Sequence, residues 1–187
     1  MRRFLIPALM ISLLLTGCGN GGAERKLRTQ QEKAAGAAEL SFTAEITAEL
    51  SEEVFSCTLA CTADAEGVTA ELLAPESLAG IRARVGNGET RLEYENLALS
   101  MGTAGLEHIS PVSAAPLLAE ALRSGFLRRC WTEKDGERTL IAAEIYVTDD
   151  AELSLWFDGE TMAPVHGEFY QNGSMVLRCE IRDFILK

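Results

Sequence analysis

The chain has 187 residues, of which 47% are hydrophobic and 24% charged, and its formal net charge at pH 7 is -11. This length and composition predict one folded domain and exclude a largely disordered chain. The acidic balance argues against binding to nucleic acid or to anionic lipid headgroups, so any attachment to a membrane has to be hydrophobic or covalent.

The N-terminus has the three parts of a bacterial export signal. Arg2 and Arg3 precede an apolar run, Phe4 to Leu15, which is too short to span a bilayer. The tetrapeptide Leu15-Thr16-Gly17-Cys18 follows, and it resembles the lipobox of bacterial lipoprotein signal peptides. An ordinary secretory signal with a chance cysteine is the alternative interpretation.

The lipobox resemblance implies a removed signal peptide and a lipid anchor. Residues 1–17 would be cleaved off, and Cys18 would carry acyl chains, palmitate among them. Residues 18–23 would form a lipidated tether, made flexible by the glycines between Gly19 and Ala23. The expected location is the extracytoplasmic face of the cell membrane. No later apolar run approaches the length of a transmembrane helix, so no other span is expected.

A helix and a long series of strands are expected behind the tether. Residues 24–38 are rich in Ala, Gln, Glu, Lys and Arg, which favour a helix on the surface of the domain. From Leu40 to Leu50, apolar and polar residues alternate without a break, which indicates a strand with one wet face. Similar alternation recurs later, separated by pairs such as Asp135-Gly136 and Asn172-Gly173 that favour tight hairpin turns. The pattern predicts an antiparallel meander of about ten or eleven strands.

One predicted helix interrupts the meander over residues 110–125. Ser110 is suited to its N-cap, Pro111 to its first helical position and Gly125 to its C-terminal stop. Pro116 would cost about 3 kcal/mol inside a helix, whereas a helix that starts at Ser113 would hold this proline in its first turn. In both versions the apolar residues share one side of the helix, which therefore has to cover one face of the sheet.

The order of these elements, together with two turns, resembles a known family. In residues 155–165, LWFDGETMAPV, a hydrophobic strand ends in Asp-x-x-Thr and a proline opens the next strand. Residues 74–81, APESLAGI, contain a Pro-Glu-x-x-Ala-Gly turn. Both resemble the LolA/LolB-like lipoprotein-carrier superfamily, in its lipobox-bearing Gram-positive type, over residues 24–187. The resemblance implies a curved, incompletely closed antiparallel half-barrel, mainly β, with an N-terminal helix and a covering helix.

The same resemblance implies a hydrophobic cavity for acyl chains between the sheet and the covering helix. Many inward-facing residues are small, which leaves space inside a large sheet unless a helix fills it. The alternative is that the larger inward residues simply pack a solid core. The predicted cavity-lining residues are Phe42, Ile46, Phe55, Leu59, Leu72, Ile81, Leu92, Leu99, Leu117, Leu118, Leu122, Ile141, Ile145 and Phe157.

Four cysteines remain after the lipobox, namely Cys57, Cys61, Cys130 and Cys179. Cys57 and Cys61 would lie about 13 Å apart on one strand, which is too far for a disulfide between them. In an exported chain each could instead pair with Cys130 or Cys179, giving two disulfides. Four buried free thiols are the alternative. A zinc site is disfavoured because Cys-x3-Cys on a strand gives poor tetrahedral geometry.

The sequence carries no motif that predicts catalysis. It contains no Gly-x-Ser-x-Gly elbow, no His-Glu-x-x-His, no phosphate-binding loop and no paired-carboxylate motif. His108 and His166 are interpreted as a capping and a surface histidine, and the acidic residues alternate as a solvated strand face should. We therefore expect a protein that is not an enzyme and needs neither a metal nor a cofactor.

The leading functional hypothesis is a membrane-anchored lipoprotein that binds an apolar ligand or the acyl chains of lipids or lipoproteins. Its expected partners are the membrane, through the N-terminal lipid, and a lipid or lipoprotein ligand. The alternative hypothesis is a non-enzymatic interaction module, in which the same half-barrel binds or stabilises a cell-envelope or spore-cortex protein.

Overall fold

The computed structural model describes residues 21–50, 53–86, 89–102, 109–148 and 151–187. The predicted signal peptide (1–17), the predicted lipid-attachment residue Cys18 and His108 lie outside these residues. In the part of the chain that is described, neither the length nor the apolar character of any helix is sufficient to cross a membrane.

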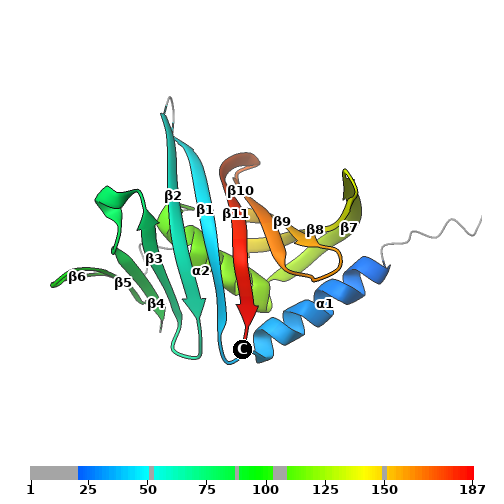
Figure 1. The fold of residues 1–187 in the computed structure, drawn as a ribbon, viewed down its shortest axis with the longest axis horizontal. Helices are drawn as coiled ribbons and strands as arrows, with labels where there is room; N and C mark the ends of the chain where they lie inside the picture. Colours follow the sequence, from blue (N-terminus) through cyan, green and yellow to red (C-terminus); the bar gives the residue numbers. More distant parts are fainter. Residues whose placement is uncertain (1–20, 51–52, 87–88, 103–108, 149–150) are drawn as a thin grey trace, which may run out of the picture.

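Antiparallel strands form one open, curved sheet (Figure 1). Its spatial order is β6-β5-β4-β3-β2-β1-β11-β10-β9-β8-β7, so β1 and β11 pair in the middle while β6 and β7 form the edges. This architecture confirms the predicted fold class, an incompletely closed half-barrel. The eleven strands are β1 (Leu40–Leu50), β2 (Glu53–Ala63), β3 (Val68–Ala74), β4 (Arg82–Gly86), β5 (Glu89–Tyr94), β6 (Leu97–Gly102), β7 (Phe126–Asp135), β8 (Arg138–Thr148), β9 (Ala151–Asp158), β10 (Pro164–Gln171) and β11 (Ser174–Leu186).

The period-two pattern gives this sheet one apolar face. In β9, for example, Leu153, Leu155 and Phe157 are at most 1% exposed, whereas the residues between them are half-buried. The register also aligns small residues from strand to strand, so that the helices can approach this face closely. One such row crosses six strand pairs and consists of small residues except for Leu155 and Ile46. In order it contains Cys130, Ala143, Leu155, Gly167, Cys179, Ile46 and Cys57.

The edge strand β7 is the strand that the alternation pattern does not identify. Of its ten residues only Cys130 is buried, and charged residues such as Arg128 and Arg129 follow one another. A strand at the edge of a sheet has few neighbours on either face, so its sequence carries little hydrophobic periodicity.

The N-terminal helix α1 (Gly21–Gly36) begins earlier than the sequence predicts. Gly21 to Ala23, expected in the flexible tether, are helical, and the helix ends at Gly36 instead of residue 38. The reason is burial. Ala23 is 4% exposed and lies on the same stripe as the other buried residues of this helix, which are Leu27, Gln30 and Ala34.

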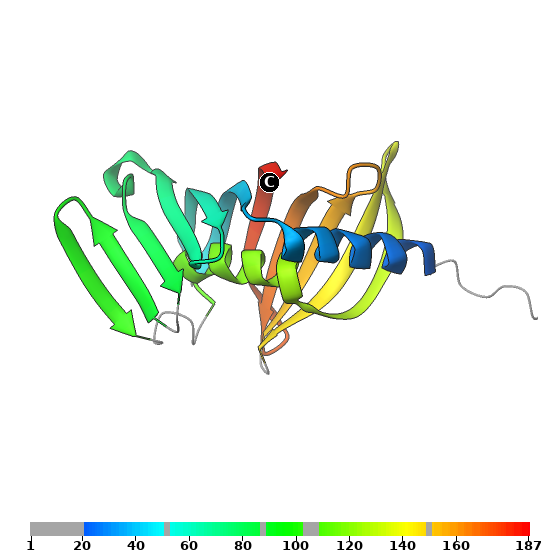
Figure 2. The same cartoon turned by 90° about the horizontal axis from the view of Figure 1, so that it is seen from below.

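The second helix, α2 (Pro111–Ser124), connects the two edge strands, and a short 3-10 helix, η1 (Glu76–Leu78), lies between β3 and β4. Both long helices lie on the same, concave face of the sheet (Figure 2). Helix α2 contacts β1, β2, β3 and β8, whereas α1 contacts α2 and β7. Strands β5 and β6 reach beyond the end of α2 (Figure 2).

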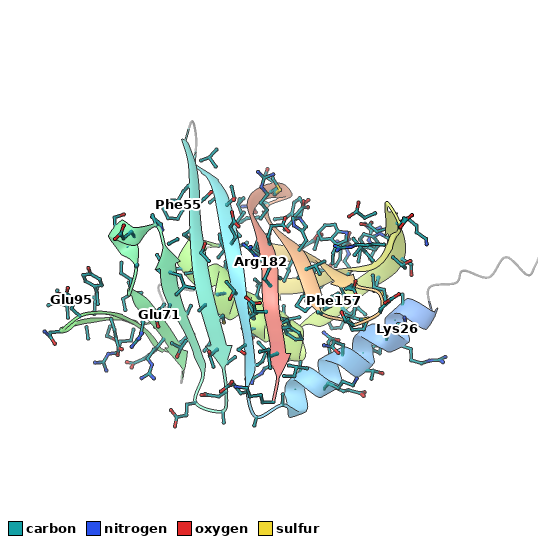
Figure 3. The ribbon with its side chains drawn as sticks, viewed as in Figure 1. Lys26, Phe55, Glu71, Glu95, Phe157 and Arg182 are labelled. Carbon is teal, nitrogen blue, oxygen red and sulfur yellow. The ribbon has the colours of Figure 1, made fainter. Side chains whose placement is uncertain are left out.

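The turn after β9 holds α1 in place. Asp158 Oδ1 accepts hydrogen bonds from the Thr161 amide (2.8 Å), the Thr161 hydroxyl (2.9 Å) and the Glu160 amide (3.2 Å). Lys26 of α1, labelled in Figure 3, donates its Nζ to the carbonyl of Gly159 at 2.8 Å. The Asp-x-x-Thr motif is therefore a turn that a helix contacts.

We expect the Asp158 turn to make stability depend on pH. The hydrogen bonds from Thr161 lower the pKa of Asp158 below its ordinary value of 3.8, so its contribution is complete above that value and is lost as the pH falls through the lowered pKa. Because the side chain is only half-buried and water screens its interactions, Asp158→Asn should lower the free energy of unfolding by no more than about 1 kcal/mol at pH 7. Urea unfolding at a series of pH values should show the two proteins converging in acid.

The matched control is Asp135→Asn in the β7–β8 hairpin, where no hydrogen bond to the carboxylate is found among the described residues. It should leave the pH profile of unfolding unchanged. This role of the carboxylate would be contradicted if the free energies of unfolding of wild type and Asp158→Asn differed by the same amount at pH 7 and in acid.

Candidate functional site

The N-terminal end of α2 is capped as the sequence suggests. Ser110 Oγ accepts a hydrogen bond from the Ser113 amide (3.2 Å), and Ser113 Oγ accepts one from the Ser110 amide (2.9 Å). Pro111 occupies the first turn, where its missing N–H costs nothing. The helix thus begins at Pro111, with Ser110 as its N-cap, and not at Ser113, and Pro116 lies buried inside it.

Two side chains hold the C-terminal end of α2, one from α1 and one from α2 itself. Gln31 of α1 donates to the carbonyls of Ala121 (3.4 Å) and Gly125 (3.0 Å). Arg123 donates to the carbonyls of Ala63 (2.7 Å) and Asp64 (3.0 Å) in the turn between β2 and β3. Hydrogen bonds of this kind contribute about 0.5–1.5 kcal/mol each, and those from the charged Arg123 guanidinium are the stronger ones. Helix α2 is therefore fixed to α1 on one side and to the sheet on the other.

An apolar pocket lies beside α2, between this helix and the ends of β3 and β4. Its volume is about 250 Å³, and its lining is Val68, Val85, Pro116, Leu117, Ala119, Glu120, Arg123 and Ser124. Most of these side chains are aliphatic, which suits a hydrocarbon and not a charged ligand. Ligand pockets usually measure about 300–1,000 Å³, so this one can take part of an acyl chain and not a whole lipid.

The structure places most of the predicted cavity residues in the packed core under the helices. Small inward residues such as Ala44 and Ala143 have no exposed surface, because α2 fills the space that they leave. Leu117 is the predicted residue that also lines the apolar pocket. For the others, contact with a ligand stays a prediction. Of all the predicted cavity residues, the buried ones are Phe42, Ile46, Leu59, Leu72, Leu117, Leu118, Leu122, Ile141, Ile145 and Phe157, and the partly buried ones are Phe55, Ile81 and Leu92.

The structure corrects the prediction that Leu99 lines a cavity under α2. Leu99 is 61% exposed and lies on β6, which extends beyond the end of α2. The register aligns Ala83, Leu92 and Leu99 across β4, β5 and β6, so all three point to the concave face. Tyr94 and Leu97, which pair with each other, share that face and are 42% and 75% exposed. We call Leu92, Tyr94, Leu97 and Leu99 the extension face.

Sequence reasoning missed several residues of this region. Val68 and Val85 have the right period to face inward, but their pairing across β3 and β4 depends on a register that the pattern does not give. Pro116 lines the apolar pocket, whereas its sequence context indicates only a cost to the helix. Tyr94 and Leu97 carry the signal of an apolar strand face, which by itself does not say whether a helix covers it.

All four cysteines outside the lipobox are free and buried, so the structure favours thiols over the two disulfides. Ile46 lies between Cys57 and Cys179 in the row across the sheet, which separates the two cysteines by two strand spacings, about 9.5 Å. Burial raises the pKa of Cys61 to about 12 and that of Cys179 to about 12, so both thiols stay neutral. Among the described residues no group of His, Cys, Asp and Glu side chains is arranged to hold a metal ion.

Comparison with known proteins rests on structure alone, since no protein-family model and no curated protein matches the chain. A putative outer membrane lipoprotein-sorting protein domain from Vibrio parahaemolyticus has 14% identity and a TM-score of 0.52, covering 88% of this chain and 93% of that one. An uncharacterized conserved protein from Thermus thermophilus has 13% identity and a TM-score of 0.52, covering 88% of both chains. A LolA superfamily protein from Nitrosomonas europaea has 9% identity and a TM-score of 0.49, and the match covers 88% of this chain and 93% of that one. The first two show that the chain shares their fold.

Proposed function

We propose that this protein is a lipid-anchored binding protein of the extracytoplasmic membrane face, and that its domain holds an acyl chain of a lipid or lipoprotein. The observation that carries the proposal is the apolar pocket between α2 and the ends of β3 and β4. The shared fold with a putative lipoprotein-sorting domain supports it. The protein makes and breaks no bond in this proposal. It removes hydrocarbon from water, at about 0.8 kcal/mol for each buried methylene.

The proposed anchor rests on the lipobox-like sequence that ends at Cys18. Helix α1 begins at Gly21, three residues later, and three residues span at most about 11 Å. The start of α1 would therefore stay close to the bilayer surface. In Figure 1 this end of α1 lies far from β6, so β6 would lie at the end of the domain that is remote from the attachment point.

Deep entry of an acyl chain requires α2 to move. The apolar pocket has room for a few methylene groups, and the larger space next to it is filled by the buried residues of α2. Any outward shift of the helix has to break the hydrogen bonds that Gln31 and Arg123 make to backbone carbonyls. The proposed mechanism is therefore burial of the chain end in the apolar pocket, followed by displacement of α2 for longer chains.

Native mass spectrometry of the full chain, purified from its own membrane, tests the proposal. Covalent acyl groups stay on the protein under collisional activation, whereas a lipid held in the pocket dissociates as a separate mass. We expect Val85→Phe, which fills the pocket from a half-buried position, to reduce the dissociable lipid without unfolding the domain. Val54→Phe, at a position that is 67% exposed, is the control. Reproducible absence of dissociable lipid from the wild-type protein would exclude the proposal.

A second candidate function, binding of an envelope protein, is favoured by edge strand β6. Its sequence, LALSMG, has no charged residue and no proline, although exposed edges are usually protected by such residues. Together with the extension face it could pair with a strand of a partner. A photo-crosslinker at position 98 should then give one specific adduct, and Leu97→Lys with Leu99→Lys should remove it.

A further inference from the structure

Both tryptophans of the chain lie outside the core, on the convex face of the sheet. The sequence contains two, Trp131 on β7 and Trp156 on β9, and the register places them on either side of Ala142. Ala142 is 1% exposed even though it points away from the helices. The two indoles therefore cover it. Large aromatic side chains usually add to the core, so their position on a solvent-facing sheet surface calls for another explanation.

One carboxylate fixes both indoles. Glu133 Oε1 accepts a hydrogen bond from Trp156 Nε1 at 2.6 Å, and Glu133 Oε2 accepts one from Trp131 Nε1 at 3.1 Å. His166 lies beside Trp156 with a ring-centroid distance of 5.1 Å, and its Nδ1 lies 2.8 Å from Glu180 Oε1. The aromatic groups are thus held in defined orientations by hydrogen bonds before any ligand arrives, which lowers the entropic cost of binding.

A depression of about 480 Å³ opens beside Trp156 on this face. Its lining is Glu133, Lys134, Asp135, Arg138, Leu140, Trp156, Val165, His166 and Glu180. Leu140, Val165 and the indole supply apolar surface, while the remaining side chains supply both hydrogen-bond donors and acceptors. Lys134, Asp135 and Arg138 form no ion pair among the described residues, so their polar atoms are available to a ligand.

We propose that this convex-face depression binds a pyranose sugar of a glycan. The C–H groups on one side of a sugar ring suit the face of Trp156, as one apolar surface against another. Each sugar hydroxyl both donates and accepts, which matches a lining that mixes the carboxylates of Asp135 and Glu180 with the cations of Lys134 and Arg138. A hydrocarbon would leave these charges unpaired, and an anion would meet three carboxylates. The site is independent of the apolar pocket and of the acyl-binding proposal.

Tryptophan emission reports directly on this site. The experiment titrates the full-length protein, in a detergent without a sugar headgroup, with chitotriose and separately with maltotriose. We expect a saturable change in emission with at least one of these sugars, and the corresponding heat in a calorimetric titration. Trp131→Phe keeps the depression intact and leaves Trp156 as the single reporter, so the change should persist in that variant.

Two matched arginine variants identify the site. Arg138→Ala removes an exposed donor from the depression and should weaken sugar binding at least about tenfold. Arg84→Ala, on β4 near the opposite edge of the sheet, should leave the affinity unchanged. The proposal is overturned if neither sugar gives a saturable emission change or heat, or if Arg138→Ala binds as tightly as wild type.

Discussion

Leu118→Ala is expected to lower the free energy of unfolding by about 2–5 kcal/mol. Leu118 is fully buried in α2 and belongs to the cluster of core residues between the helices and the sheet. Its removal leaves a cavity that the neighbouring backbone cannot close, because α2 is fixed at its C-terminal end by Gln31 and Arg123. Urea unfolding, followed by circular dichroism, measures the loss as a shift of the midpoint at constant slope.

The control for this substitution is Leu73→Ala on β3. Leu73 is 48% exposed, so the same change in side chain should alter the free energy of unfolding by no more than about 0.5 kcal/mol. If Leu118→Ala and Leu73→Ala lowered the free energy of unfolding equally, Leu118 of α2 would not be packed in the core.

The strands and the limits of α2 were predictable because local chemistry determines them. Unbroken alternation from Leu40 to Leu50 fits only a strand with one buried face, and β1 has these bounds. Ser110 begins α2 because its side chain accepts a hydrogen bond from the free amide of Ser113. The helix ends at Gly125, where the space beside the backbone is too small for a Cβ. The alternation pattern did not identify strand β7, because an edge strand with exposed faces needs no alternating apolar residues.

The candidate site was harder to predict because it depends on which parts of the sheet α2 covers. Leu99 and Phe42 have the same strand period and lie in one row across β1 to β6, yet one is 61% exposed and the other 3%. The difference is their distance from α2 along that row, which no local pattern contains. The choice between two disulfides and four free thiols stayed open for a related reason, since only the register shows that Ile46 separates Cys57 from Cys179.

Gly125→Ala is expected to destabilise the protein by about 1–3 kcal/mol through overpacking. The backbone of Gly125 has a φ of -57°, which alanine adopts readily, so the cost is steric and not conformational. An added Cβ would lie against Ile145 Cγ2, 2.6 Å from the Ala121 carbonyl oxygen and 2.8 Å from Ala121 Cα. Because backbone atoms of α2 cannot rotate away, the end of the helix has to shift, which breaks the hydrogen bond from Gln31 to the Gly125 carbonyl.

Hydrogen exchange on the last turn of α2, together with urea unfolding, measures both parts of this effect. Faster exchange of the amides there is expected in Gly125→Ala, because the helix end loses its contact with α1. Gly36→Ala is the matched control, since no atom lies within 4 Å of a Cβ added at the end of α1, and its stability should equal or slightly exceed that of wild type. Equal free energies of unfolding for Gly125→Ala and Gly36→Ala would contradict this prediction. They would mean that the end of α2 moves without cost. The apolar pocket could then open for a long acyl chain without breaking the hydrogen bonds of Gln31 and Arg123.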